Sequence, residues 1–113
     1  MSPQRLKRAE LVGRASVFAA LGDETRLALV RTLASGAPRS ISQLTQGSRL
    51  TRQAISKHLR VLEGAGIVAS ARAGRESRFQ LRTEPLQEMR SYLERVSSQW
   101  EEALGRLRSL VEE

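Results

Sequence analysis

Side chains of the types that hydrogen-bond to DNA recur on one face of the segment 51–64. The segment reads TRQAISKHLRVLEG, and its first acidic residue is Glu63. Arginine and glutamine make paired hydrogen bonds to guanine and adenine, and an α-helix fits the major groove of B-DNA. The pattern predicts a recognition helix there. Its candidate DNA contacts are Thr51, Arg52, Gln53, Ser56, Lys57 and Arg60.

Positive charge is concentrated in the middle of this 113-residue chain, whose net charge is +7. Residues 36–82 carry nine basic and two acidic side chains, whereas residues 83–113 carry four basic and seven acidic ones. Such a concentrated positive field favours a polyanionic partner, here double-stranded DNA. The alternative interpretation is a basic face that only keeps the protein in solution.

A period of two predicts short strands over residues 67–72 and 77–81, with a glycine-containing turn between them. Phe79 and Leu81 then point to one face, and basic or polar side chains point to the other. Arginines near the turn could reach phosphates or enter the minor groove. These candidates are Arg72, Arg75 and Arg78. Arg39 and Arg49 are expected to add phosphate contacts at the edges of the motif.

Three further helices must position these groups. Apolar spacing predicts a first helix over residues 8–21. Asp23 is a predicted N-cap for a second helix that buries Leu27, Val30 and Leu33, together with Leu29. A short third helix is expected to begin with a capping box formed by Ser40 and Gln43. Thr51 would cap the recognition helix, and Gly64 and Gly66 would end it.

The segment after Pro85 carries an apolar seam with coiled-coil-like spacing. Its members are Leu86, Met89, Leu93, Val96, Trp100, Ala103, Leu107 and Leu110. A small winged domain cannot cover the whole seam, so pairing with a second copy is expected. The predicted dimer contacts are Leu11, Ala15, Phe18, Leu93, Val96, Trp100, Leu104 and Leu107. The alternative is that this helix folds back and completes the core of its own chain.

Together these elements predict a mostly α fold with a small β-hairpin (α+β), arranged as a winged helix-turn-helix. We expect one domain over residues 1–113, with a winged core at about 22–82 and dimerisation helices at about 8–21 and 85–112. The absence of cysteine and the single histidine, His58, argue against a metal site, a cofactor or an enzyme. His58 is expected to be structural or to contact phosphate. No apolar run approaches the ~20 residues of a membrane span and no signal peptide is recognisable, which predicts a cytoplasmic protein.

Two sequence stretches resemble the ArsR-type family of bacterial transcription regulators. Residues 21–27 (LGDETRL) are similar to the opening of a family helix, and residues 56–62 (SKHLRVL), followed by 66–68 (GIV), are similar to its recognition helix. Residues 74–81 resemble its wing. The resemblance implies a homodimeric repressor that leaves its operator when a signal is sensed. This chain lacks the cysteines and the C-terminal histidines with which other members bind metals, so the inducer is unknown.

These observations predict a sequence-specific DNA-binding regulator that reads an inverted repeat as a homodimer. The recognition helix would lie in the major groove, and the wing at residues 67–82 would lie on the backbone or in the minor groove. The main alternative is a non-specific, architectural DNA-binding protein, which would bind random duplexes with similar affinity. A winged domain used as a protein-binding adaptor is a further alternative, which the uninterrupted basic face disfavours.

Overall fold

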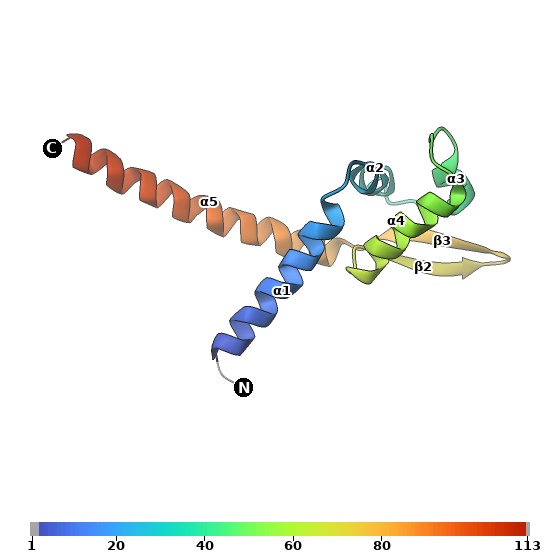
Figure 1. The fold of residues 1–113 in the computed structure, drawn as a ribbon, viewed down its shortest axis with the longest axis horizontal. Helices are drawn as coiled ribbons and strands as arrows, with labels where there is room; N and C mark the ends of the chain where they lie inside the picture. The colour runs from blue at the N-terminus through green and yellow to red at the C-terminus, as the bar shows by residue number, and fades with distance from the viewer. Residues whose placement is uncertain (1–2, 113) are drawn as a thin grey trace.

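The chain folds into a winged body from which two long helices project (Figure 1). A computed structural model describes residues 3–112, with side chains from Lys7 onward. The elements are α1 (Pro3–Leu21), α2 (Glu24–Leu33), β1 (Arg39–Ser40), α3 (Ile41–Thr45), α4 (Arg52–Gly64), β2 (Val68–Ala73), β3 (Glu76–Leu81) and α5 (Thr83–Glu112). The predicted winged helix-turn-helix is therefore confirmed.

Side-chain caps begin the three helices of the helix-turn-helix region, as predicted from the sequence. The Asp23 carboxylate accepts the backbone N–H of Arg26 at 3.0 Å at the start of α2. Ser40 and Gln43 form the reciprocal capping box of α3, and the Thr51 hydroxyl accepts a backbone N–H from the first turn of α4. Each cap satisfies a donor that the helix leaves unpaired, so the starts of these helices are determined locally.

The core lies between α2, α4 and the sheet. The largest fully buried side chains are Leu33, Ile55, Leu59, Leu62, Ile67 and Val68. Within α4 the buried residues Ile55, Leu59 and Leu62 form an apolar stripe that fixes one face of this helix against the body. Gly66 follows α4 with φ +78°, a left-handed conformation that turns the chain from this helix into β2.

The predicted burial of Leu27 in α2 is wrong, because its side chain is 53% exposed. The buried leucines of this helix are Leu29 and Leu33. At about 100° per residue, Leu27 lies nearly opposite Leu29 on the helix. The core-facing positions are 26, 29, 30 and 33, and the first of these is occupied by Arg26 rather than by an apolar residue.

The sheet has three strands, one more than the predicted hairpin, in the order β1-β3-β2. Both pairs are antiparallel, with Val68 opposite Leu81 in the hairpin and Arg39 opposite Phe79 at the other edge. The hairpin turn contains Gly74 with φ +67°. Because β1 has only two residues, a period of two cannot be recognised in its sequence, and its pairing with β3 depends on the fold.

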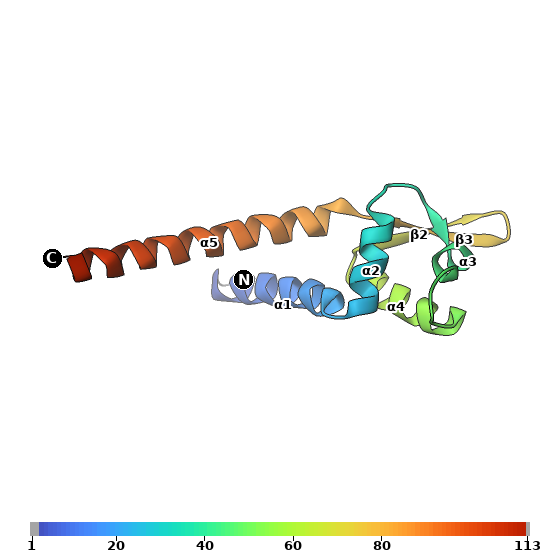
Figure 2. The ribbon, with the colours of Figure 1, turned by 90° about the horizontal axis from the view of Figure 1, so that it is seen from above.

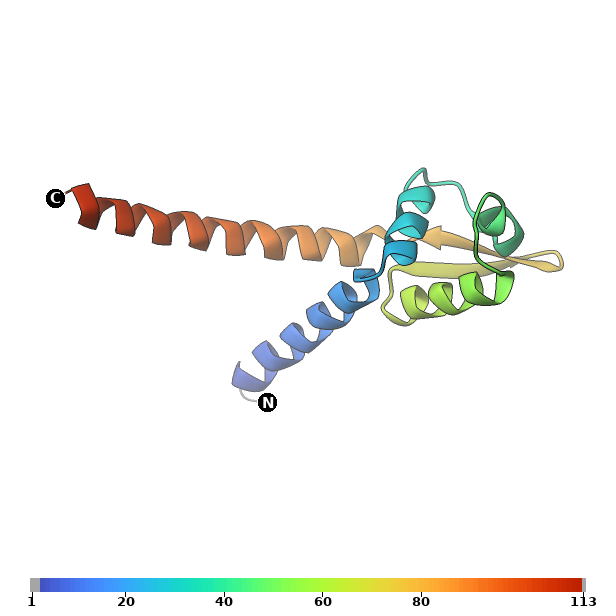
Figure 3. The ribbon, with the colours of Figure 1, turned by 45° about the horizontal axis from the view of Figure 1, so that its top comes forward.

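Helices α1 and α5 leave the winged body on the same side and diverge from one another (Figure 3). They contact each other close to the body, where the rings of Phe18 and Tyr92 meet edge-on with centroids 6.2 Å apart. Both helices begin earlier than predicted, at Pro3 and Thr83 rather than near residues 8 and 85. Because α1 and α5 project from the winged body, the molecule is elongated, measuring 67 × 38 × 21 Å.

Most of the apolar seam on α5 remains exposed. Within this helix, all of which is described, only Met89 is buried, and Trp100 is 63% exposed. The interpretation in which the helix folds back into its own core is therefore wrong. Of the other predicted dimer contacts, Leu11, Ala15, Leu93, Val96 and Leu107 are exposed, and Phe18 and Leu104 are half-buried. Across residues 3–112, no helix combines the length and apolar character that a membrane span requires.

Candidate nucleic-acid interface

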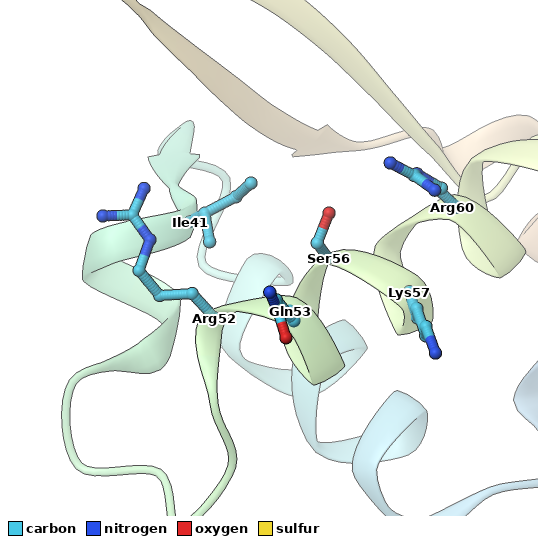
Figure 4. Close-up of a pocket in the computed structure, with 6 residues that line it drawn as sticks. All are labelled: Ile41, Arg52, Gln53, Ser56, Lys57 and Arg60. Carbon is cyan, nitrogen blue, oxygen red and sulfur yellow. The ribbon is translucent and has the colours of Figure 1, made fainter.

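Helix α4 presents two rows of polar side chains on the side away from the core. One row, at a spacing of four residues, consists of Arg52, Ser56 and Arg60, and the second consists of Gln53 and Lys57. All five are exposed except Ser56, which is half-buried. Figure 4 shows the first row pointing toward the side where the strands run, with Arg60 nearest to them, while Lys57 points the other way. The helix therefore offers hydrogen-bonding groups over a broad arc.

A shallow hollow of about 430 Å³ lies along this face of α4. It is lined by the five polar side chains and by Ile41 of α3 (Figure 4). The lining is thus provided by both helices of the helix-turn-helix, with the longer helix supplying every hydrogen-bonding group. A hollow with one apolar wall and several long donor side chains suits the edge of a base pair or a phosphate group.

Among the side chains that the structure describes, those of residues 7–112, no carboxylate forms an ion pair with the cations of this face. The ion pairs within 4.0 Å in this range join His58 to Asp23, Arg82 to Glu84, and Arg90 to Glu94. The acid nearest along α4, Glu63, accepts a hydrogen bond from the Ser70 hydroxyl at 2.6 Å. The charges of α4 are consequently available to an external anion.

The predicted phosphate contacts just before α4 and in β1 differ in how accessible they are to solvent. Arg49 and Thr51 are exposed. The Thr51 hydroxyl oxygen accepts the backbone N–H of Ala54 at 3.2 Å, which leaves its own O–H free to donate. The helix N-terminus adds backbone N–H groups and a dipole that favour an anion. Arg39 is half-buried in β1, opposite Phe79, and is less accessible than Arg49.

The wing carries its arginines on two faces and at the tip. Arg72 pairs with Ser77, and Arg78 pairs with Ala71, so the strand alternation places these two arginines on opposite faces of the hairpin. Ser70, on the same face as Arg72, contacts Glu63 of α4, which shows that Arg72 lies on the side of the recognition helix. Arg75 lies in the turn beside Gly74. The hairpin extends past α4 (Figure 2) and presents all three charges to solvent.

Arg26 joins three helices, a role that the sequence analysis did not assign to it. Its guanidinium donates hydrogen bonds to the backbone carbonyls of Ala19 and Ala20 at the end of α1 and lies 3.2 Å from Nδ1 of His58 in α4. It therefore ties three helices together at one point. Its place at position 26 of the buried stripe 26-29-30-33 is the signal that would have identified it. His58, predicted to be structural or to contact phosphate, is part of this junction.

Asp23 completes the junction. Its carboxylate lies 3.8 Å from Nδ1 of His58. The pKa of Asp23 is lowered, chiefly because the carboxylate accepts the backbone N–H of Arg26, and desolvation opposes this effect. The charges of Arg26 and His58 lower the pKa further. Asp23 thus favours its ionised form in the fold, where its carboxylate caps α2 beside His58 of the recognition helix.

Comparisons with known proteins agree with this architecture. Residues 21–71 match the profile of a helix-turn-helix domain family. The chain is 36% identical over 93 residues to the HTH-type transcriptional regulator Rv2034 of Mycobacterium tuberculosis. This alignment covers 82% of this chain and 83% of that protein. An ArsR-like transcriptional regulator from Rhodococcus sp. RHA1 superposes with a TM-score of 0.79 at 37% identity, over 90% of this chain and 95% of that one.

A more distant solved structure shares the fold. The homodimeric winged helix-turn-helix DNA-binding domain Mb0332 of Mycobacterium bovis, described as a possible ArsR-family regulator, superposes with a TM-score of 0.69 at 22% identity. The alignment covers 91% of this chain and 93% of that domain. The long helices that flank the winged body are therefore included in the similarity.

Proposed function

Because the chain belongs to the ArsR family of DNA-binding helix-turn-helix transcriptional regulators, we propose that it is a homodimeric repressor of a specific operator. Each copy inserts α4 into the major groove of one half of an inverted repeat. The wing follows the adjacent backbone or enters the minor groove. The observation that carries the proposal is the outer face of α4, where unpaired cations and an amide adjoin one another on a helix fixed by its core stripe.

The side chains of α4 divide between base recognition and phosphate binding. Arg52 and Gln53 lie in the first turn of the helix, which approaches base edges most closely in helix-turn-helix complexes. Ser56 lies one turn further, in the same hollow. Lys57 and Arg60 are long enough to reach either bases or backbone, and Arg49, at the edge of the motif, would bind phosphate. The wing arginines Arg72, Arg75 and Arg78 add sequence-independent contacts.

The exposed seam of the projecting helices supports the homodimer. Over 30 residues, α5 is about 45 Å long at ~1.5 Å per residue, and Leu93, Val96, Trp100 and Leu107 remain exposed along it. Leu11 of α1 adds a further exposed apolar position. A second copy is the simplest cover for such a patch, since a two-fold interface needs only one self-complementary surface. The same two-fold axis would match an inverted repeat with half-sites about 34–36 Å apart.

The test begins by selecting DNA fragments that the purified protein retains from genomic DNA. The affinity for the selected sequence is then compared with the affinity for a random duplex at several salt concentrations. A specific repressor should prefer its site by ~10³-fold or more. Equal affinities would contradict the proposal and would indicate the architectural alternative.

Three variants separate the proposed roles of α4 and the wing. Arg52→Ala or Gln53→Ala should each remove about 1–3 kcal/mol of discrimination between operator and random DNA. Arg75→Ala should weaken both duplexes alike and, because both wings of the dimer lose a phosphate contact, reduce the slope of log K against log salt by about 1.8, or about 0.9 per contact. If Arg52→Ala also weakens both duplexes alike, the helix contacts only phosphate. An unchanged salt slope for Arg75→Ala would remove the wing tip from the interface.

A further inference from the structure

One wall of the hollow along α4 is apolar, and this wall comes from a different helix. Five of the six lining residues are polar and belong to α4, whereas the sixth is Ile41 of α3. Figure 4 shows Ile41 beside the first turn of α4, on the side toward which Ser56 points. Ile41 is half-buried, so part of its side chain packs against the core and the rest is open to the hollow. The contacts proposed above for α4 make no use of this apolar surface.

The neighbours of Ile41 hold it in a fixed position. Ser40, directly before it, pairs with Arg78 of β3 and caps α3 with a side chain that is 4% exposed. The carbonyl oxygen of Ile41 accepts a hydrogen bond from the Thr45 hydroxyl at 2.7 Å. Because isoleucine is branched at Cβ, its χ1 angle in a helix is almost restricted to one rotamer. The open part of the Ile41 side chain therefore has a defined place beside α4.

An aliphatic wall suits one chemical group of the DNA better than the others. It offers a phosphate no hydrogen-bond donor and removes water from it, which disfavours binding of the anion. Among the groups that base pairs present in the major groove, the C5-methyl of thymine is the apolar one. Burying one methyl group raises affinity by about fourfold, which corresponds to about 0.8 kcal/mol. The wall formed by Ile41 therefore matches a thymine.

We propose that Ile41 is a specificity-determining residue that recognises thymine. When α4 lies in the major groove, the C5-methyl of one thymine in each half-site packs against the open part of the Ile41 side chain. Arg52 and Gln53 recognise hydrogen-bonding groups, and Ile41 adds a preference for thymine over cytosine, which lacks the methyl. Sequence recognition is thus shared between α4 and α3. The inference rests on the proposed function, because it requires a specific operator.

Replacement of thymine by uracil tests the proposal, since uracil keeps the hydrogen-bonding groups of thymine and lacks only the methyl. Each thymine of the selected operator is replaced in turn, at equivalent positions of both half-sites, and the affinity of the full chain is measured by fluorescence anisotropy at one salt concentration. We expect one position at which uracil weakens binding by about fifteenfold, or about fourfold per half-site. If no replacement weakens binding to a selected operator, this inference fails and the repressor function does not. If the chain selects no sequence, both fail.

A matched pair of variants assigns the methyl contact to Ile41. Ile41→Ala should reduce the difference between thymine and uracil at that position to less than about twofold, because the wall is then missing. Val30→Ala truncates another half-buried β-branched side chain that packs against the core but lies outside the hollow, and it should keep the full difference.

Both duplexes are compared with the same variant, so any loss of folded protein cancels from the ratio of the two affinities. Ile41→Val removes a single methylene and should reduce the difference by a smaller amount, which provides the test if Ile41→Ala does not fold. A difference that persists unchanged in the Ile41 variants would overturn the proposal, since the methyl would then contact another residue. An equal decrease in Val30→Ala would also overturn it.

Discussion

The winged core, residues 22–82, and the two helical arms, α1 and α5, both contain apolar residues at regular spacing but use them differently. In the core the stripe of α4 ends in a side chain, Leu62, that is 0% exposed, whereas Trp100 in the seam of α5 is 63% exposed. A periodic apolar face is therefore satisfied within the chain in one region and left open in the other. Sequence periodicity indicates which face will be buried, but it does not indicate which chain covers that face.

The two regions also differ in charge. Residues 36–82 carry a net charge of +7, and residues 83–113 carry −3. The basic region presents its arginines on α4 and on the wing, while α5 projects away from the winged body (Figure 1). An acidic arm is repelled by a polyanion and a basic core is attracted to it. The charge distribution thus favours an orientation in which DNA meets the core and α5 points away from it.

The largest expected effect is on stability, and it comes from replacing a leucine by alanine in each of the two regions. Leu62→Ala removes a fully buried side chain and should lower the free energy of unfolding by about 2–5 kcal/mol. Leu107→Ala, in the exposed seam, should matter only through the dimer. Urea unfolding at several protein concentrations measures both, because the stability of a dimer depends on concentration. Equal losses at every concentration would show that the seam of α5 belongs to the core of a single chain.

A charge in the seam should have the next largest effect. Trp100→Glu places a carboxylate in the proposed interface and should weaken self-association by about 100-fold, since buried tryptophans at interfaces commonly contribute 2 kcal/mol or more. Light scattering over a dilution series would detect the shift toward the 12.6 kDa monomer. Ser98→Glu is the control, because residue 98 lies off the seam. An unchanged mass for Trp100→Glu would place the interface elsewhere.

Features that depend on nearby residues were predictable from the sequence, and those that depend on distant contacts were not. The caps formed by Asp23, Ser40 and Thr51 involve atoms within one helical turn. The short strand β1 exists only because its two residues pair with β3, about forty positions along the chain. The contacts that Arg26 makes with α1 and α4 are likewise between residues far apart in the chain, so the stripe at 26, 29, 30 and 33 marks its position but not its partners.

The same distinction applies to the candidate site. The polar face of α4 could be predicted because side chains on one helix have fixed relative directions. The placement of Arg72 and Arg78 on opposite faces of the wing could not, since it depends on the register of the hairpin. The turn spans only two residues between Ala73 and Glu76, whereas the sequence predicts a longer one. A shift of one residue in register would reverse the face of every side chain in a strand.

The smallest expected effect lies at the junction between the two regions. Because the pKa of Asp23 is lowered in the fold, its ionised form stabilises the protein above its unfolded-state pKa, near pH 4. This contribution is lost as the pH falls through the lowered folded-state pKa. Asp23→Asn keeps a capping oxygen but removes the charge. The variant should therefore be less stable than the natural chain at about pH 7, and the difference should narrow at about pH 3.

Urea unfolding at both pH values measures this difference, with Glu24→Gln as the control. Glu24 is the adjacent carboxylate in the first turn of α2, so its replacement changes the net charge equally and leaves the cap in place. If the capping bond to Arg26 and the neighbouring His58 are responsible, Asp23→Asn should show the stronger dependence on pH. If the stabilities of the two variants depend on pH to the same extent, the effect comes from the helix dipole alone. The charge of Asp23 would then make no specific contribution through the capping bond to Arg26 or through His58.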